Sequence, residues 1–241
     1  MVAEGTDGVA LTDGTGVVPL STARGDQLRA GPIAVPLDAD TAAVVSPDRL
    51  HLVGPQGELN AVTCKGCMGI AAAAGELVTA HNNDANNDTF DIVVLDHQLS
   101  EVSAVAAPRL KEETVVADRS PLHDPAVLAA STETVTVSYL SVNSNEDGGP
   151  SVLAQYSRSG ELLASVMIDG TVRRSAVSPN GRFLAIGPSL YGGACPVNSD
   201  PLLFELDGLR PRELGPGVPT GLAGGALAFE ATDVAWDGSV A

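Results

Sequence analysis

The chain has 241 residues, 44% of them hydrophobic, so it can bury a sizeable core and is neither a disulfide-stapled miniprotein nor a disordered tail. Its 30 acidic and 13 basic residues give a formal net charge of -17. Because binding to nucleic acid needs clustered cations that neutralise phosphates, this balance argues against a nucleic-acid partner.

Membrane insertion is also not expected. The longest apolar stretches, residues 67–75 and 221–229, are much shorter than the roughly 20 residues of a membrane-spanning helix. The chain does not open with a charged segment followed by an apolar run, so it shows no signal peptide. An exported or cell-surface bacterial protein whose leader is absent from this sequence is one interpretation of its location.

Strand-like segments follow one another along the whole chain. No window of roughly 11 to 18 residues has the apolar spacing of an amphipathic helix. Short runs rich in Val, Leu, Ile, Thr and Ala end instead at Gly, Pro, Asn or Asp, which favour tight turns. The clearest runs are residues 9–11, 41–45, 50–53, 91–95, 132–140 and 183–186. This pattern predicts an all-β fold.

Two kinds of turn recur between these runs. In the first kind, Ser46-Pro-Asp-Arg-Leu-His-Leu-Val53 matches Ser178-Pro-Asn-Gly-Arg-Phe-Leu-Ala-Ile186, and looser copies cover residues 72–80, 127–135 and 234–240. Copies of the second kind cover residues 54–59, 95–101, 156–162 and 204–209. An internal repeat of one structural unit is therefore predicted, although the first interval, from residue 47 to residue 75, is shorter than the others.

The segment from Ser178 to Ala185 resembles the turn of WD40-like and TolB-like β-propellers. This resemblance implies a radial stack of blades, and the mean spacing of the turns is close to the roughly 40 to 50 residues of a four-stranded blade. The strict WD40 signature pairs are not matched, since Trp236-Asp237 lies inside a turn. We expect a β-propeller of about five to six four-stranded blades, with a β-sandwich carrying long loops as the alternative. Residues 1–241 are read as a single domain, closed by its N-terminal strands or else a fragment.

A loop rich in oxygen ligands precedes the run at residues 91–95. Asp84, Asn86 and Asp88 occupy alternate positions along the loop, and Asp91 follows it. Side chains of this kind can supply the six to eight oxygen ligands that calcium prefers. The loop resembles the calcium loops of FG-GAP propellers, although it lacks their glycine and is one residue shorter. Residues 143–151 resemble these calcium loops less closely. The alternative is a solvated hairpin loop, because Asn and Asp are ordinary turn formers.

Cys64 and Cys67 form a C-x-x-C pair, with Cys195 far away in the sequence. A zinc site usually needs a second such pair, and a thioredoxin-like motif belongs before a helix, which this β-rich context does not predict. A local disulfide and two free thiols are the main interpretations. A metal or redox site is the third.

No signature of a catalytic nucleophile is found, and the histidines His51, His81, His97 and His123 are scattered singly. Three long connections, residues 82–90, 142–150 and 188–201, are expected between the same two strands of their units and hence on one face. We therefore expect a non-catalytic propeller that binds a protein, peptide or surface ligand, with no catalytic residues assigned. The alternative is a propeller enzyme of the lactonase or quinone-dependent dehydrogenase type, with carboxylates or calcium in a central channel.

Overall fold

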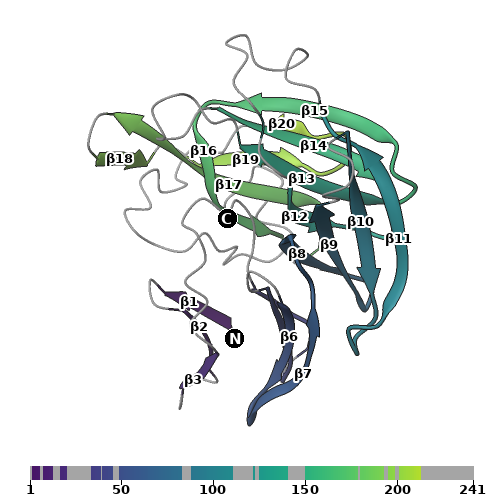
Figure 1. Cartoon of the computed structure of the whole chain (residues 1–241). Helices are drawn as coiled ribbons and strands as arrows, with labels where there is room; N and C mark the ends of the chain where they lie inside the picture. The colour runs from purple at the N-terminus through teal and green to yellow at the C-terminus, as the bar shows by residue number, and fades with distance from the viewer. Residues whose placement is uncertain are drawn as a thin grey trace.

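The computed structural model is built from β-strands, and its described residues contain no helix, which confirms the all-β prediction (Figure 1). No membrane-spanning helix is found among them. The described residues are 2–5, 8–12, 17–20, 34–38, 40–45, 49–82, 88–110, 122, 125–140, 150–178, 180–192, 195–198 and 201–212.

The strands form consecutive antiparallel units in which each strand pairs with its neighbour along the chain. The first unit is a three-stranded sheet of β1 (Val2–Gly5), β2 (Gly8–Thr12) and β3 (Val17–Leu20). The second unit is a four-stranded sheet of β4 (Ala34–Pro36), β5 (Ala42–Val45), β6 (Arg49–Gly54) and β7 (Gly57–Thr63).

The third and fourth units are joined into one curled sheet of eight strands, seen edge-on in Figure 1. The third unit contains β8 (Cys67–Ala73), β9 (Glu76–Asn82), β10 (Thr89–Leu95) and β11 (Glu101–Pro108). The fourth contains β12 (Ala126–Ala130), β13 (Thr134–Leu140), β14 (Ser151–Ser157) and β15 (Leu162–Ile168). They meet through a parallel pairing of β8 with β12 at Gly69 and Val127.

The fifth unit follows directly and has the same order, with one extra strand. Its strands are β16 (Thr171–Val177), β17 (Phe183–Gly192), β18 (Cys195–Asn198), β19 (Leu202–Glu205) and β20 (Arg210–Arg212). The extra strand β18 pairs with the far end of β17. The connection predicted at residues 188–201 is therefore partly strand, because β17 continues to Gly192 and turns back as β18.

Among the residues that the structure describes, hydrophobic side chains form three separate cores, each between two consecutive units. One lies between the second and third units around Leu50 and Ile70. Another lies between the third and fourth units around Phe90, and the last between the fourth and fifth units around Leu184. Each middle unit is consequently buried on both faces, which explains why β10 reads as a continuous apolar run rather than an alternating one.

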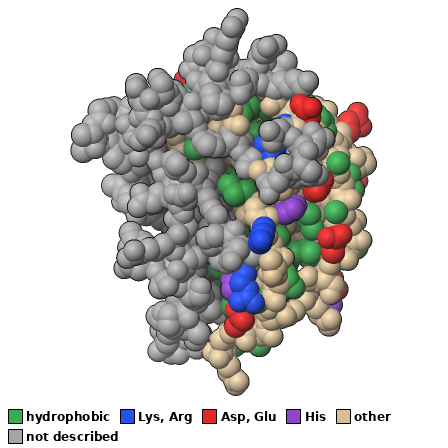
Figure 2. Space-filling view, in the orientation of Figure 1, with side chains coloured by type: hydrophobic (Ala, Val, Ile, Leu, Met, Phe, Trp, Pro, Cys, Tyr) green, Lys and Arg blue, Asp and Glu red, His purple; other side chains and the backbone are tan. Residues whose placement is uncertain are grey.

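The first and fourth strands of the units have different surroundings. The first strands of successive units lie against one another, β1 with β4, β4 with β8, β8 with β12 and β12 with β16. The fourth strands β7, β11, β15 and β20 are mostly exposed. On the side where β10 and β11 lie, hydrophobic and acidic side chains alternate on the surface (Figure 2).

The repeated turns occupy equivalent positions with one exception. All four copies of the second kind join the third strand of a unit to the fourth. Copies of the first kind near residues 75, 131 and 180 join the first strand to the second, but Ser46-Pro47-Asp48 joins the second to the third. In the second unit the equivalent turn is at residues 37–41, and this accounts for the short first interval of the predicted repeat. The copy at residues 234–240 lies outside the described residues.

Two buried tyrosines form hydrogen bonds in the core between the third and fourth units. The Tyr139 and Tyr156 hydroxyls are 2.8 Å apart, and the Tyr156 hydroxyl also donates to the Pro108 carbonyl oxygen at 2.9 Å. The ring of Phe90 meets both phenol rings edge-on. Burial raises the pKa of Tyr156 to about 12 and raises that of Tyr139 further.

Candidate functional site

The predicted calcium loop is described only in part. Asp84 and Asn86 lie outside the described residues. Asp88 is exposed in the turn before β10, and its carbonyl oxygen accepts a hydrogen bond from the Arg109 N–H at 2.9 Å. Asp91 is half-buried on β10 itself. The described residues alone contain no group of three or more His, Cys, Asp or Glu side chains that could hold a metal.

The cysteine pair lies in the turn that links the second unit to the third. Cys64 and Cys67 are joined as a disulfide, with their Cα atoms 5.5 Å apart, and Cys67 is fully buried. Cys67 is opposite His81 on β9, and His81 is opposite Asp91 on β10. Opposite residues of antiparallel strands share a face, so these three side chains form a row on the face turned toward the second unit. Nothing in the sequence spacing indicated this row. Cys195 is placed at the start of β18, and its side chain is not described.

The other histidines have separate environments. The His51 Nδ1 atom is 2.6 Å from the Glu58 Oε2 atom, so this mostly buried ring has a carboxylate partner on the next strand. His97 is exposed in the turn between β10 and β11. His123 lies outside the described residues. The three described histidines, His51, His81 and His97, therefore do not converge on one site.

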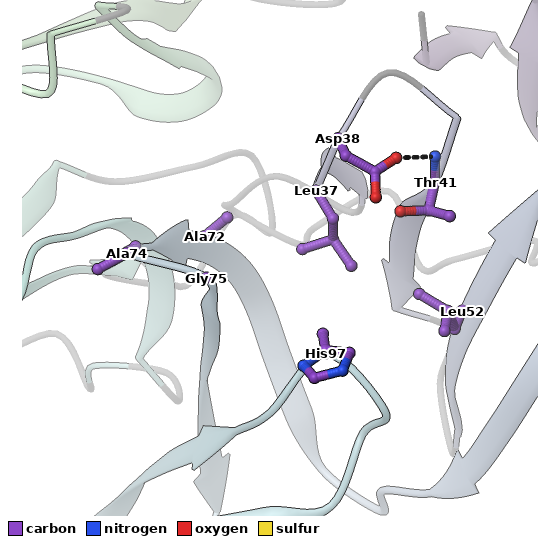
Figure 3. A pocket seen from close by; sticks show the side chains of 9 residues that line it. Leu37, Asp38, Thr41, Leu52, Ala72, Ala74, Gly75 and His97 are labelled. Carbon is purple, nitrogen blue, oxygen red and sulfur yellow. Dashed lines mark hydrogen bonds between the residues drawn. The ribbon is translucent and has the colours of Figure 1, made fainter.

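A surface cavity of about 450 Å³ lies between the second and third units (Figure 3). One wall is the turn between β4 and β5, with Leu37, Asp38 and Thr41, and Leu52 of β6 lies beside it. The facing wall is the hairpin between β8 and β9, residues 72–75, and His97 projects between the two walls. We call this cavity, with these lining residues, the interunit slot.

The turn that carries Asp38 is held by the carboxylate itself. Its Oδ1 atom accepts hydrogen bonds from the N–H groups of Asp40 at 2.8 Å and Thr41 at 2.7 Å. These bonds lower the pKa of Asp38 below its usual value, and the bond from the Asp40 N–H has the largest effect. Figure 3 shows the Asp38 carboxylate turned toward the Thr41 N–H group that donates to it. The slot therefore carries a carboxylate that is ionised at neutral pH.

Sequence reasoning did not identify the interunit slot. Its walls come from three turns that are separated along the chain, so no local motif contains them. The only local signal is Asp38-Ala-Asp-Thr41, in which an Asp side chain can bond to backbone N–H groups two and three residues later. That signal predicts a turn and gives no information on what faces it.

No protein-family model and no curated protein sequence matches this chain. Among solved structures, hydrazine synthase of Kuenenia stuttgartiensis is similar with a TM-score of 0.44 and 15% identity, over 70% of this chain and 48% of that one. A cobalt-substituted apocarotenoid oxygenase of Synechocystis gives a TM-score of 0.45 and 11% identity, over 88% and 58%. The tricorn protease gives 0.40 and 13%, over 77% and 16%.

This chain spans less than two thirds of the length of each of these three structures. Their low TM-scores and identities carry no argument about the activity of this protein. The repeated units and the chemistry of its own surface have to supply that argument.

Proposed function

We propose that the units are the blades of a single β-propeller domain, in a repeat of the WD40-like or TolB-like kind. The observation that supports this is the chain of contacts from first strand to first strand, with a separate core between the second and third, the third and fourth, and the fourth and fifth units. A β-sandwich would instead enclose one core between two sheets. One three-stranded unit, three four-stranded units and one four-stranded unit with an extra strand correspond to five blades.

We further propose that this propeller is a non-catalytic module that binds a protein, peptide or surface ligand. In the third, fourth and fifth units the longest connection joins the second strand to the third. Connections at equivalent positions of a propeller leave from the same face, and binding residues concentrate on such loops over a rigid scaffold. A surface assembled from several blades fits recognition of an extended partner.

Selection of ligands from a displayed peptide library and on a glycan array tests this function. In one variant the nine residues 141–149 are replaced by a Gly-Ser segment of equal length. In a matched control, Ser159 in the turn from the third to the fourth strand is replaced by glycine. Selected ligands should bind the first variant at least tenfold more weakly and the control unchanged, with the urea midpoint of both variants as the check on folding.

Two outcomes would overturn the proposal. One is the absence of any ligand whose binding depends on the connections between second and third strands. The other is turnover of a lactone or an alcohol substrate by the purified protein, which would support the alternative of a propeller enzyme.

A further inference from the structure

The interunit slot combines two apolar walls with a charged rim. Leu37 and Leu52 belong to the wall of the second unit, and Ala72 belongs to the wall of the third. These walls face each other across the cavity, with the His97 ring between them and the Asp38 carboxylate on the side of the second unit (Figure 3). An aliphatic chain can pack between the walls while its polar end meets the carboxylate.

The charge of the slot is not balanced by its own lining. The lining residues that the structure describes include Asp38 and no lysine or arginine. Asp40 adds a second exposed carboxylate in the same turn, two residues away. The chain as a whole carries a formal net charge of -17, which attracts cationic ligands from a distance and disfavours anionic ones. Charge complementarity therefore selects a cation as the occupant.

We propose that the interunit slot binds a lysine side chain of a peptide partner. The methylene stem of the lysine packs between Leu37 and Ala72, and its ammonium group pairs with the Asp38 carboxylate. A lysine is favoured over a compact cation because the apolar walls gain from burying its stem. This inference rests on the proposed binding function and adds to it a second site and the chemistry of its ligand.

Binding of two matched dipeptides to protein labelled with 13C at the alanine methyl groups tests the proposal. The probes are N-acetyl-leucyl-lysine amide and N-acetyl-leucyl-norleucine amide, which differ in the ammonium group. The lysine probe should shift the methyl signals of residues 72–74 and saturate at roughly millimolar concentration, as expected for one ion pair with modest apolar burial. The norleucine probe should bind at least fivefold more weakly.

Asp38→Asn isolates the charge, because the amide oxygen can still accept the two N–H bonds that hold the turn. This variant should lose the preference for lysine over norleucine. Asp169→Asn is the matched control, since it removes one exposed carboxylate outside the slot and changes the net charge equally. It should bind the lysine probe as the original protein does. Ala72→Leu, which fills the slot, should weaken both probes.

Any of three outcomes would overturn the binding of lysine in the interunit slot. The two dipeptides could shift the alanine methyl signals equally, the two asparagine variants could lose affinity for the lysine probe equally, or the methyl signals of residues 72–74 could stay unshifted. Unchanged urea midpoints would show that the variants are folded. Because the slot lies outside the connections between second and third strands, its failure would leave library ligands that depend on residues 141–149 unaffected. The two proposals can therefore fail separately.

Discussion

Gly69 lies where the backbones of β8 and β12 meet, and no other residue type fits there. Its φ is +68°, in the left-handed region that favours glycine. A Cβ atom at this position would lie 2.3 Å from the Val127 carbonyl oxygen and 2.8 Å from the Val127 nitrogen. The Thr79 hydroxyl donates to the Gly69 carbonyl oxygen at 2.8 Å from the other side. The contact between the third and fourth units therefore depends on glycine, which has no side chain, at this position.

Gly69→Ala should destabilise the protein by about 2 to 4 kcal/mol, the sum of a left-handed alanine and an overpacked backbone contact. Gly75→Ala is the matched control, because Gly75 has a φ of +82° and no atom within 4 Å of an added Cβ. It should lose only about 1 to 2 kcal/mol. Urea unfolding measures both values. Equal losses in the two variants would contradict the close approach of β8 and β12.

At the scale of elements, the turns between third and fourth strands of the third and fourth units share a hydrogen-bonding pattern. The Asp96 N–H donates to the Ser100 carbonyl oxygen at 2.9 Å, as the Ser157 N–H donates to the Glu161 carbonyl oxygen at 2.8 Å. In each turn the first residue's side chain accepts an N–H bond from the residue four positions later. Different sequences thus build one turn because Asp and Ser side chains can both act as the acceptor.

The left-handed residue of these turns shows how packing overrides local preference. Gly160 occupies this position in the fourth unit with a φ of +86°, whereas Leu99 occupies it in the third with a φ of +66°. Leucine is unfavourable in this conformation, but Leu99 is buried in the core between the second and third units. Burial of its side chain offsets the backbone strain. A turn without glycine is consequently harder to predict from the sequence.

The connection between β9 and β10 carries the calcium prediction. If Asp84, Asn86, Asp88 and Asp91 bind the ion, millimolar calcium should raise the unfolding temperature by several degrees relative to EDTA at equal ionic strength, because a ligand that binds the folded state stabilises it. Asp84→Ala combined with Asp88→Ala should abolish the shift, and Asp169→Ala should retain it. Equal unfolding temperatures with calcium and with EDTA would rule out this site.

At the scale of the whole molecule, the dependence of stability on pH follows from groups at both ends of the titration range. Hydrogen bonds to the charged carboxylates lower the pKa values of Asp38, Asp96 and Glu205, through the N–H of Asp40, the N–H of Ser100 and the Arg212 side chain respectively. Their stabilising contribution is present above the unfolded pKa of about 4 and is lost as the pH falls through the lower folded values.

The pair of Tyr139 and Tyr156 makes the stability depend on pH in alkaline solution. Because burial raises the folded pKa of Tyr156 to about 12, the unfolded chain ionises first as the pH rises above about 10. The free energy of unfolding should therefore fall by about 2 kcal/mol between pH 10 and 12 from Tyr156 alone. Urea unfolding from pH 2 to 12 should give a plateau between about pH 5 and 9 that declines on both sides. In Tyr156→Phe the alkaline decline should be smaller. An alkaline decline of the same size in this variant would refute the assignment.

Several features of this protein are readable from the sequence because they depend on neighbouring residues. The run at residues 91–95 lies in β10, and the run at residues 132–140 contains β13, which begins at Thr134. The turns at residues 54–59 and 204–209 both join a third strand to a fourth, since turn chemistry acts within a few residues. Ser46-Pro47-Asp48 matches Ser178-Pro179-Asn180 in sequence, but it joins the second strand of its unit to the third rather than the first to the second. Its local sequence specifies a turn, and only the pairing of β4 with β5 shows which turn it is.

The features that involve two units depend on tertiary structure. Three such features bring together residues from separate strands or turns. They are the contact of Gly69 with Val127, the row of Cys67, His81 and Asp91, and the interunit slot. The sequence determined an all-β chain of repeated hairpins, because side-chain alternation and turn chemistry are local. Tertiary packing decided which faces meet and where the slot opens, because burial of apolar area between units depends on register and shape that no single segment contains.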